Sequence, residues 1–407
     1  MPWRVDLSPL RRRQVRLVVG GQGLSTLAAA ILAVALPFEL FRLTRSSFAV
    51  GLLGAVEVVP LAATALLGGL AADSRDRRRV VLWATAAGLL VPVALSVADL
   101  RRGVSGWMLY LAAGVAFTTQ GLARPSLEAV LPRVAGPGEL APAIAASSMA
   151  GGAAMVGGAA GAGALIAWRG PAAAYLAAAG TGLAAVILLL RLTAPASGSP
   201  GELSIGALRE GVSYAASRPE LLGTYLVDVV AMVFGMPLAV MPAVAARMGS
   251  ASALGLLYAA PSAGAILAAA LSGRAVTVAR HGRAVILAAG FWGAAIVGFG
   301  FAPDLATSLV CLAAAGAADM VSGLFRQRIW NETIPDRLRG RLAGLEMLSY
   351  TLGPALGNVE AGGVAALAGV RVCVVSGGLA CVAGCAALAG ALPALWSYEA
   401  APSRTVS

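Results

Sequence analysis

Long apolar runs separated by short polar connections set the pattern of this chain. A bilayer core of about 30 Å needs about 20 apolar residues in a helix that rises about 1.5 Å per residue. Twelve runs of this kind occur, at residues 17–39, 48–71, 80–99, 106–123, 143–166, 172–192, 221–245, 253–272, 284–302, 305–325, 342–362 and 372–395. The pattern therefore predicts an all-α membrane protein with twelve transmembrane helices.

The longest polar connection divides these runs into two sets of six. Residues 194–201 are rich in Pro, Ser and Gly, and the amphipathic stretch Leu203–Ser217 follows. This composition is typical of a flexible linker followed by an interfacial helix. We expect an N-terminal six-helix bundle (1–192), a linker with an interfacial helix (193–220) and a C-terminal six-helix bundle (221–407). Short matches between the halves favour two pseudo-repeats.

Composition and charge agree with a membrane location. Hydrophobic residues make up 59% of the chain and charged residues only 12%, which excludes an ordinary water-soluble globule. All 30 basic residues are arginine, and they fall in short bursts between apolar runs, unlike a nucleic-acid-binding face. The N-terminus, alternate connections and the C-terminal tail carry 23 of them, and the opposite connections carry 7. The positive-inside rule thus predicts a multi-pass protein of the cytoplasmic membrane with both termini cytoplasmic.

The connection between the second and third runs carries the most specific local motif. It resembles the signature of the major facilitator superfamily, with matches at Gly69, Asp73, Arg77 and Arg78. Ser74 and Asp76 stand where a basic residue and a glycine are usual. The resemblance implies a conformational latch in which the carboxylate bonds a neighbouring helix N-terminus. The alternative is that these arginines serve only as a topology signal.

Two glycine-rich segments resemble the antiporter motif of the same superfamily. The matching residues are Gly157, Gly161, Gly353, Pro354 and Gly357. Glycine and proline at these places favour bendable, closely packed helices.

More of the chain is similar to the enterobactin (siderophore) exporter family. The similar segments are residues 50–53, 71–79, 123–132, 255–261 and 334–342. The resemblance implies a proton-coupled exporter of a small molecule, with siderophores as the family's named substrates, working as a monomer in the lipid bilayer. The implied energy source is the proton gradient, with no cofactor. A multidrug or antibiotic exporter of the same fold is the nearest alternative, and a non-transporting receptor or scaffold is the alternative from another class.

The sequence also lacks the motifs of other classes of protein. It has no nucleotide-binding P-loop, no metal-ligand spacing and no pairing of nucleophile with base. We therefore expect no metal, no catalytic residue and no enzymatic activity.

Acidic residues inside apolar runs are the candidate functional groups. A carboxylate at mid-depth costs about 2.5 to 3.5 kcal/mol on the insertion scale, so each one requires an explanation. The clearest are Glu57, Asp228 and Asp319. In the superfamily, helices 1, 4, 7 and 10 line the cavity, and the polar residues on the corresponding runs here are Gln22, Gln120, Arg124, Tyr225, Asp228, Asp319 and Arg326.

Two readings of these acids stay open. Asp228 and Asp319 either bind the coupled proton or a substrate cation, or they form structural pairs with Arg124 or Arg326. Glu57 lies on a peripheral helix and ranks lower. Glu39 and Glu360 near the outer surface and His281 in a cytoplasmic connection are expected to be solvated. Glu346, near the inner end of the run at 342–362, is expected to be solvated or to pack near the connection between the second and third runs.

Overall fold

The structure is a computed structural model, and it describes residues 6–72, 77–101, 103–128, 130–136, 138–193, 205–271 and 278–399. Within these ranges, side chains are not described at residues 59, 61–72, 77–78, 124–125, 128, 205–209, 336–337, 339–341 and 343–351. All regular secondary structure of the described residues is helical. The predicted all-α class is confirmed for this part of the chain.

The chain divides into two compact units. Unit 1 comprises Met1–Arg45, Val56–Pro200 and Ala245–Ala259, and unit 2 comprises Ser46–Ala55, Gly201–Val244 and Ala260–Ser407. The boundaries cut helices α2 (Ser47–Ala72) and α11 (Ala251–Leu271), so each of them contributes residues to both units. The units therefore differ from the expected sequence halves at residues 46–55 and 245–259.

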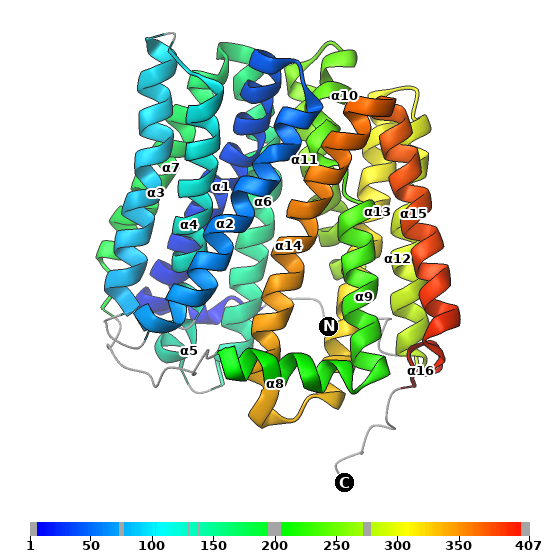
Figure 1. Cartoon of the computed structure of the whole chain (residues 1–407). Coiled ribbons are helices and arrows are strands. Elements are labelled where there is room, and N and C mark those ends of the chain that lie inside the picture. Colours follow the sequence, from blue (N-terminus) through cyan, green and yellow to red (C-terminus); the bar gives the residue numbers. More distant parts are fainter. Residues whose placement is uncertain are drawn as a thin grey trace. The chain divides into compact units, whose positions relative to one another are not determined.

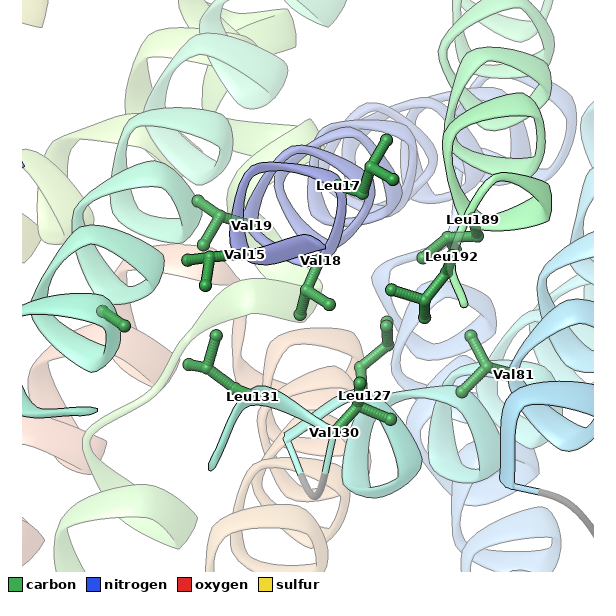
Figure 2. Packing of buried hydrophobic residues seen from close by; sticks show 11 residues of the cluster. Val15, Leu17, Val18, Val19, Val81, Leu127, Val130, Leu131, Leu189 and Leu192 are labelled. Atoms are coloured by element: carbon green, nitrogen blue, oxygen red, sulfur yellow. The ribbon is translucent and has the colours of Figure 1, made fainter. Parts of the chain in front are cut away.

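Unit 1 is built around helix α1. Its other elements are η1 (Ser8–Arg11), α3 (Arg77–Leu100), α4 (Gly106–Glu128), α5 (Leu131–Val134), α6 (Leu140–Arg169) and α7 (Pro171–Leu190), and α1 itself spans Arg13–Thr44. Helix α1 packs against α6 and α7, and α3 packs against α4 and α7 (Figure 1). Figure 2 shows Val15 and Val18 of α1 facing Leu131, Val130 and Leu127 in a buried apolar cluster. This cluster holds one end of the unit together because burying each such side chain contributes about 1.5 to 3 kcal/mol.

Unit 2 contains the remaining helices. They are α8 (Ile205–Ala216), α9 (Pro219–Phe234), η2 (Leu238–Val240), α12 (His281–Phe301), α13 (Leu305–Thr333), α14 (Asp336–Ala368), α15 (Val370–Ala391) and α16 (Pro393–Trp396), while α10 (Met241–Arg247) crosses the unit boundary. Helix α12 packs between α13 and α15, and α9 packs against α14 and α15. The short helix α8 lies across the ends of α9 and α14 in Figure 1. Its Tyr214 hydroxyl donates to the carbonyl of Thr333, the last residue of α13, at 2.9 Å.

The predicted span at 221–245 is wrong as one continuous helix. Helix α9 ends at Phe234, and Gly235 and Pro237 separate it from η2 and α10. Proline lacks a backbone N–H and restricts the residue before it, which favours a break here. The indole Nε1 of Trp292 donates to the Gly235 carbonyl at 2.8 Å and so satisfies a backbone acceptor at the break.

Nine helical segments in the described part of the chain are long and apolar enough to cross a membrane. They are Arg13–Thr44, Arg79–Leu100, Leu140–Arg169, Pro171–Leu190, Pro219–Arg247, Ala251–Leu271, His281–Phe301, Leu305–Thr333 and Val370–Ala391. Helices α2, α4 and α14 occupy the ranges of the three other predicted spans. The protein is therefore a multi-pass membrane protein.

The glycines of α6 do not pack as the antiporter resemblance suggests. A Cβ atom built on Gly157 or Gly161 would meet no atom of the described residues within 4 Å, so these two make no close contact there. The close approaches are made by Gly158, whose Cβ would lie 2.7 Å from Ala30 Cβ, and by Gly163, whose Cβ would lie 2.7 Å from the Gly255 backbone. The expected packing role of Gly157 and Gly161 is therefore wrong, because the helix turns its other face to its neighbours.

The glycines of α14 do pack closely. A Cβ on Gly353 would lie 2.8 Å from Met232 Cβ, and one on Gly357 would lie 2.5 Å from the Met232 carbonyl oxygen. Pro354 lies between them, inside α14. These residues let α14 lie against the backbone of α9, which carries Asp228.

The contrast between Gly161 and Gly163 gives a direct prediction. We expect Gly163→Ala to destabilise the protein by about 1 to 3 kcal/mol, since the added methyl meets backbone that cannot rotate away. Gly161→Ala on the same helix is the matched control, and it should be neutral or slightly stabilising because alanine has the higher helix propensity. Thermal unfolding of both variants in detergent checks this. Equal unfolding temperatures for the two variants would contradict the packing described here.

Candidate functional site

An arginine and two aspartates meet inside unit 2. Arg326 and Asp319 lie on α13, seven residues apart, and this spacing places both on one helix face. Asp228 projects from α9, and its Oδ1 contacts Arg326 Nη1 directly. The other guanidinium nitrogen, Nη2, lies 3.7 Å from Asp319 Oδ1. The sequence reading that pairs the two acids with Arg326 is thus consistent with the geometry.

The three side chains differ strongly in exposure. The side chains of Arg326 and Asp228 are 2% and 4% exposed, whereas that of Asp319 is 42% exposed. A buried ion pair tolerates its desolvation only when its partners stay in contact. Asp228 and Arg326 therefore form the fixed part of the cluster, and Asp319 is its least buried member.

A small cavity adjoins the cluster. Its volume is about 10 Å³, which is close to the minimum for one water molecule. The lining residues are Val227, Asp228, Ala231, Ala289, Trp292, Asp319, Ser322 and Arg326. A cavity of this size admits one water molecule but no metabolite.

Aromatic residues support the acid cluster from one side. Tyr225, one turn before Asp228 on α9, stacks on Trp330 with ring centroids 5.2 Å apart. The Trp330 Nε1 donates to the Thr224 hydroxyl at 2.8 Å. These contacts fix α9 against α13 at the level of the cluster.

Sequence reasoning missed two residues of the cavity lining with polar side-chain atoms, Ser322 and Trp292. Ser322 could have been found from the spacing of Asp319, Ser322 and Arg326, which follows the helical repeat of one face. Trp292 had no such signal, because its role depends on the break at Gly235.

The count of arginines by connection places Arg326 in the connection after the run at 305–325, but the structure places it inside a helix. Helix α13 continues to Thr333, about two turns beyond Arg326, which is therefore buried within the helix and is not part of the connection that follows.

The other candidate residues of the cavity helices belong to unit 1. The Ser147 hydroxyl donates to Gln22 Oε1 at 2.8 Å and links α6 to α1, while Gln120 is exposed on α4. Glu57 on α2 is half-buried and interacts electrostatically with Tyr258 of the same unit. The backbone of Arg124 is part of α4, but its side chain lies outside the described residues.

The latch motif lies largely outside the described residues. Asp73 is not among them, and Gly69, Arg77 and Arg78 are described only as backbone in α2 and α3. The latch stays a prediction.

Two groups expected to be solvated are buried. His281 starts α12 with 4% exposure, and its ring lies 5.3 Å from that of Phe325. Glu39 is completely buried on α1, where Arg42 three residues later donates two hydrogen bonds to it. Both expectations of solvation were wrong, because helices α12 and α1 extend beyond the predicted spans and their neighbours cover these residues.

A family comparison decides the class of this architecture. A profile described as "transmembrane secretion effector" matches residues 5–406. The chain belongs to the transmembrane secretion effector family. This family is of the major facilitator type, so the resemblance to that superfamily is confirmed, and the protein is a transporter-family membrane protein.

Curated relatives agree with this assignment. The chain is 27% identical over 369 residues to the enterobactin exporter EntS of Citrobacter koseri, and the match covers 90% of this chain and 88% of the relative. It is 28% identical over 373 residues to EntS of Escherichia coli O1:K1, with the same coverage. The resemblance to the enterobactin exporter family is therefore confirmed as well.

Solved structures share the fold. A bacterial homologue of the human lysosomal transporter Spinster, inward-facing and unoccupied, matches with a TM-score of 0.71 and 15% identity, covering 95% of this chain and 96% of that one. A bacterial homologue of the iron transporter ferroportin, also inward-facing, matches with a TM-score of 0.69 and 15% identity over 94% and 98%. The nucleoside transporter NupG matches with a TM-score of 0.70 and 13% identity over 94% and 99%.

Proposed function

We propose that this protein is a proton-coupled exporter of a small metabolite, in which Asp319, Asp228 and Arg326 bind and release the coupled proton. The observation that carries the proposal is the sharing of one guanidinium by two carboxylates beside a cavity of about 10 Å³. The transporter family and the EntS relatives support transport as the activity.

The proton cycle follows from the charges of the cluster. With both carboxylates ionised, the cluster carries one net negative charge in an apolar surrounding, and this is costly. A proton on Asp319 makes the cluster neutral, because Asp228 stays paired with Arg326. Asp319 is the proton-exchanging group because it alone of the three is substantially exposed. The two protonation states can then favour different conformations, which is the requirement for coupling.

The substrate class comes from the relatives. EntS is named an exporter of enterobactin, and we propose a siderophore or a similar amphiphilic metabolite as the substrate here. The metabolite binds away from the acid cluster, since the cavity there is too small for it.

The membrane arrangement completes the proposal. We propose twelve membrane-spanning helices, both termini in the cytoplasm and a monomer as the working form. Twelve predicted apolar runs support the helix count, and the excess of arginine on one side supports the orientation. The proton gradient supplies the energy, and no bound cofactor is needed.

The conformational latch gives a second prediction. Asp73→Asn should reduce export at least about tenfold while the protein folds and inserts normally, because only one conformational state loses a charge-assisted contact. Export from whole cells, normalised to the amount of folded protein, checks this. Near-normal export would show that the connection containing Asp73 acts only as a topology signal and not as a latch.

Transport into inside-out vesicles tests the proposed function. Vesicles with an acidic interior should accumulate enterobactin, and a protonophore should abolish the accumulation. A panel of cationic amphiphiles serves as the comparison, and preferential accumulation of these would identify a multidrug exporter instead. Absence of gradient-dependent accumulation of every probe would overturn the proposal.

A further inference from the structure

A second cluster of charged and polar side chains lies at one end of unit 1. Glu39 and Arg42 come from the last turns of α1, Asp99 from the last turn of α3 and Tyr175 from the first turns of α7. Arg42 binds Glu39 through Nε at 2.8 Å and Nη2 at 2.6 Å. Asp99 accepts a hydrogen bond from the Ala172 backbone N–H at the start of α7 and interacts electrostatically with both Glu39 and Arg42.

The Tyr175 hydroxyl is the unexplained group of this cluster. The residue is completely buried, and its hydroxyl has no hydrogen-bond partner among the described residues. It interacts electrostatically with Glu39, Asp99 and Arg42, so it is directed into the cluster. A buried hydroxyl left unpaired is costly, and this position therefore favours a further group that bonds to it.

The charges of the cluster do not balance. Two carboxylates share one guanidinium, and Arg42 is committed to Glu39 by its two hydrogen bonds. Among the described residues, Asp99 has no cation of its own, because it shares Arg42 with Glu39 and otherwise accepts only the Ala172 backbone N–H. It is half-buried, so it remains accessible from the helix end, whereas Glu39 is sealed inside.

We propose that these four residues form a proton-binding site in unit 1, in which Asp99 takes up one proton beside the Glu39–Arg42 pair and the Tyr175 hydroxyl. The bound proton neutralises the second carboxylate, and it adds an O–H donor that the Tyr175 hydroxyl oxygen can accept. A metal ion fits less well, since a guanidinium occupies the site and the described residues contain no group of three acidic, histidine or cysteine ligands. The proposal does not depend on the roles of Asp319 and Asp228.

The described residues of the elements around Asp99 add no competing acid. The facing charged or titratable groups are Glu39 and Arg42 of α1 and Tyr175 of α7. The start of α4, which meets Leu40 at Gly106, carries uncharged Gly106–Leu109. Arg169, at the end of α6, stacks over Trp168 at 4.5 Å.

Infrared titration of the purified protein tests this site without substrate or gradient. We expect Asp99→Asn to remove one titrating carboxylic-acid band. Glu39→Gln should lower the proton affinity of that band by about tenfold, one pH unit, because the like charge disappears and Arg42 is released to Asp99. Tyr175→Phe removes only the hydroxyl, should fold normally and should also shift the midpoint.

A matched control separates this site from ordinary carboxylates. Asp304 caps the N-terminus of α13 by accepting from the Thr307 N–H at 2.8 Å, much as Asp99 accepts from Ala172. This hydrogen bond lowers the pKa of the exposed Asp304 carboxyl below its ordinary value. Asp304→Asn should leave the Asp99 band unchanged, and Asp319→Asn should leave it in place as well.

Two outcomes of the titration would contradict the proposal. If Asp99→Asn removes no band, or if Tyr175→Phe and Glu39→Gln both leave the midpoint as in the unsubstituted protein, the four residues do not bind a proton together and the proposal is wrong. Should Asp99→Asn fail to fold, the Tyr175→Phe midpoint alone decides, with an unchanged value counting against the proposal.

Discussion

Replacing Asp319 by asparagine should abolish gradient-driven export while leaving the folded protein and substrate exchange intact. The amide resembles the protonated carboxyl and fixes the cluster in its neutral state, so the accumulation ratio should fall to about 1. Folding should be preserved because the side chain is 42% exposed and makes only a 3.7 Å contact with Arg326. The measurement is accumulation against a gradient in vesicles, together with exchange of labelled substrate at equal concentrations.

The control for this variant lies on the same helix. Asp304→Asn removes an exposed carboxylate at the start of α13, and asparagine retains the capping function. Export by that variant should stay at the level of the unsubstituted protein. Full gradient-driven accumulation by Asp319→Asn would show that this acid does not carry the proton.

Replacing Asp228 by asparagine should have a different and larger effect on folding. The substitution removes the carboxylate that contacts Arg326 directly, and both side chains are almost completely buried. Losing one partner of a buried pair costs about 3 to 5 kcal/mol, so the yield of folded protein should fall sharply. The readouts are the folded fraction by size-exclusion chromatography and the unfolding temperature.

A double variant separates the charge effect from the loss of packing. Asp228→Asn combined with Arg326→Gln removes both charges, and part of the lost stability should return because no unpaired charge stays buried. If the double variant is as unstable as the sum of its single variants, the pair is not coupled as described.

The sequence predicted the helical architecture well because its signals are local and strong. Apolar runs of about 20 residues, such as those that became α7 and α15, leave little alternative in a membrane. The break after Phe234 was visible in Gly235 and Pro237, yet the apolar run continued through it and was read as one helix. The apolar pattern reports burial in lipid and does not require an unbroken helix.

The residues of the candidate site could be predicted from the sequence, but the contacts between them could not. Asp228 and Asp319 are candidates because charges inside apolar runs are costly. Arg326 is a candidate because it follows the run of a helix that lines the cavity in the superfamily. Which acid touches the arginine depends on how α9 rotates against α13, and the Tyr225–Trp330 stack fixes this rotation through residues far apart in sequence.

The predicted packing of the α6 glycines and the predicted solvation of Glu39 are wrong for the same reason. A motif read along one helix does not reveal which face meets a neighbour, so the motif predicts contacts at Gly157 and Gly161, whereas Gly158 and Gly163 make the close approaches. The sequence places Glu39 near a helix end and so predicts a solvated side chain, but α1 continues to Thr44, and Glu39 is completely buried and paired with Arg42.

Substrate-driven proton movement tests the central claim most directly. The purified protein is placed in liposomes that contain a pH-sensitive dye, and substrate is added outside. For a proton antiporter, inward movement of substrate must move protons outward, so the lumen should become alkaline with the unsubstituted protein. With Asp319→Asn, labelled substrate should still exchange across the bilayer while the lumenal pH stays constant. Alkalinisation at the same rate per folded molecule in both proteins would contradict the assignment of the coupled proton to this cluster.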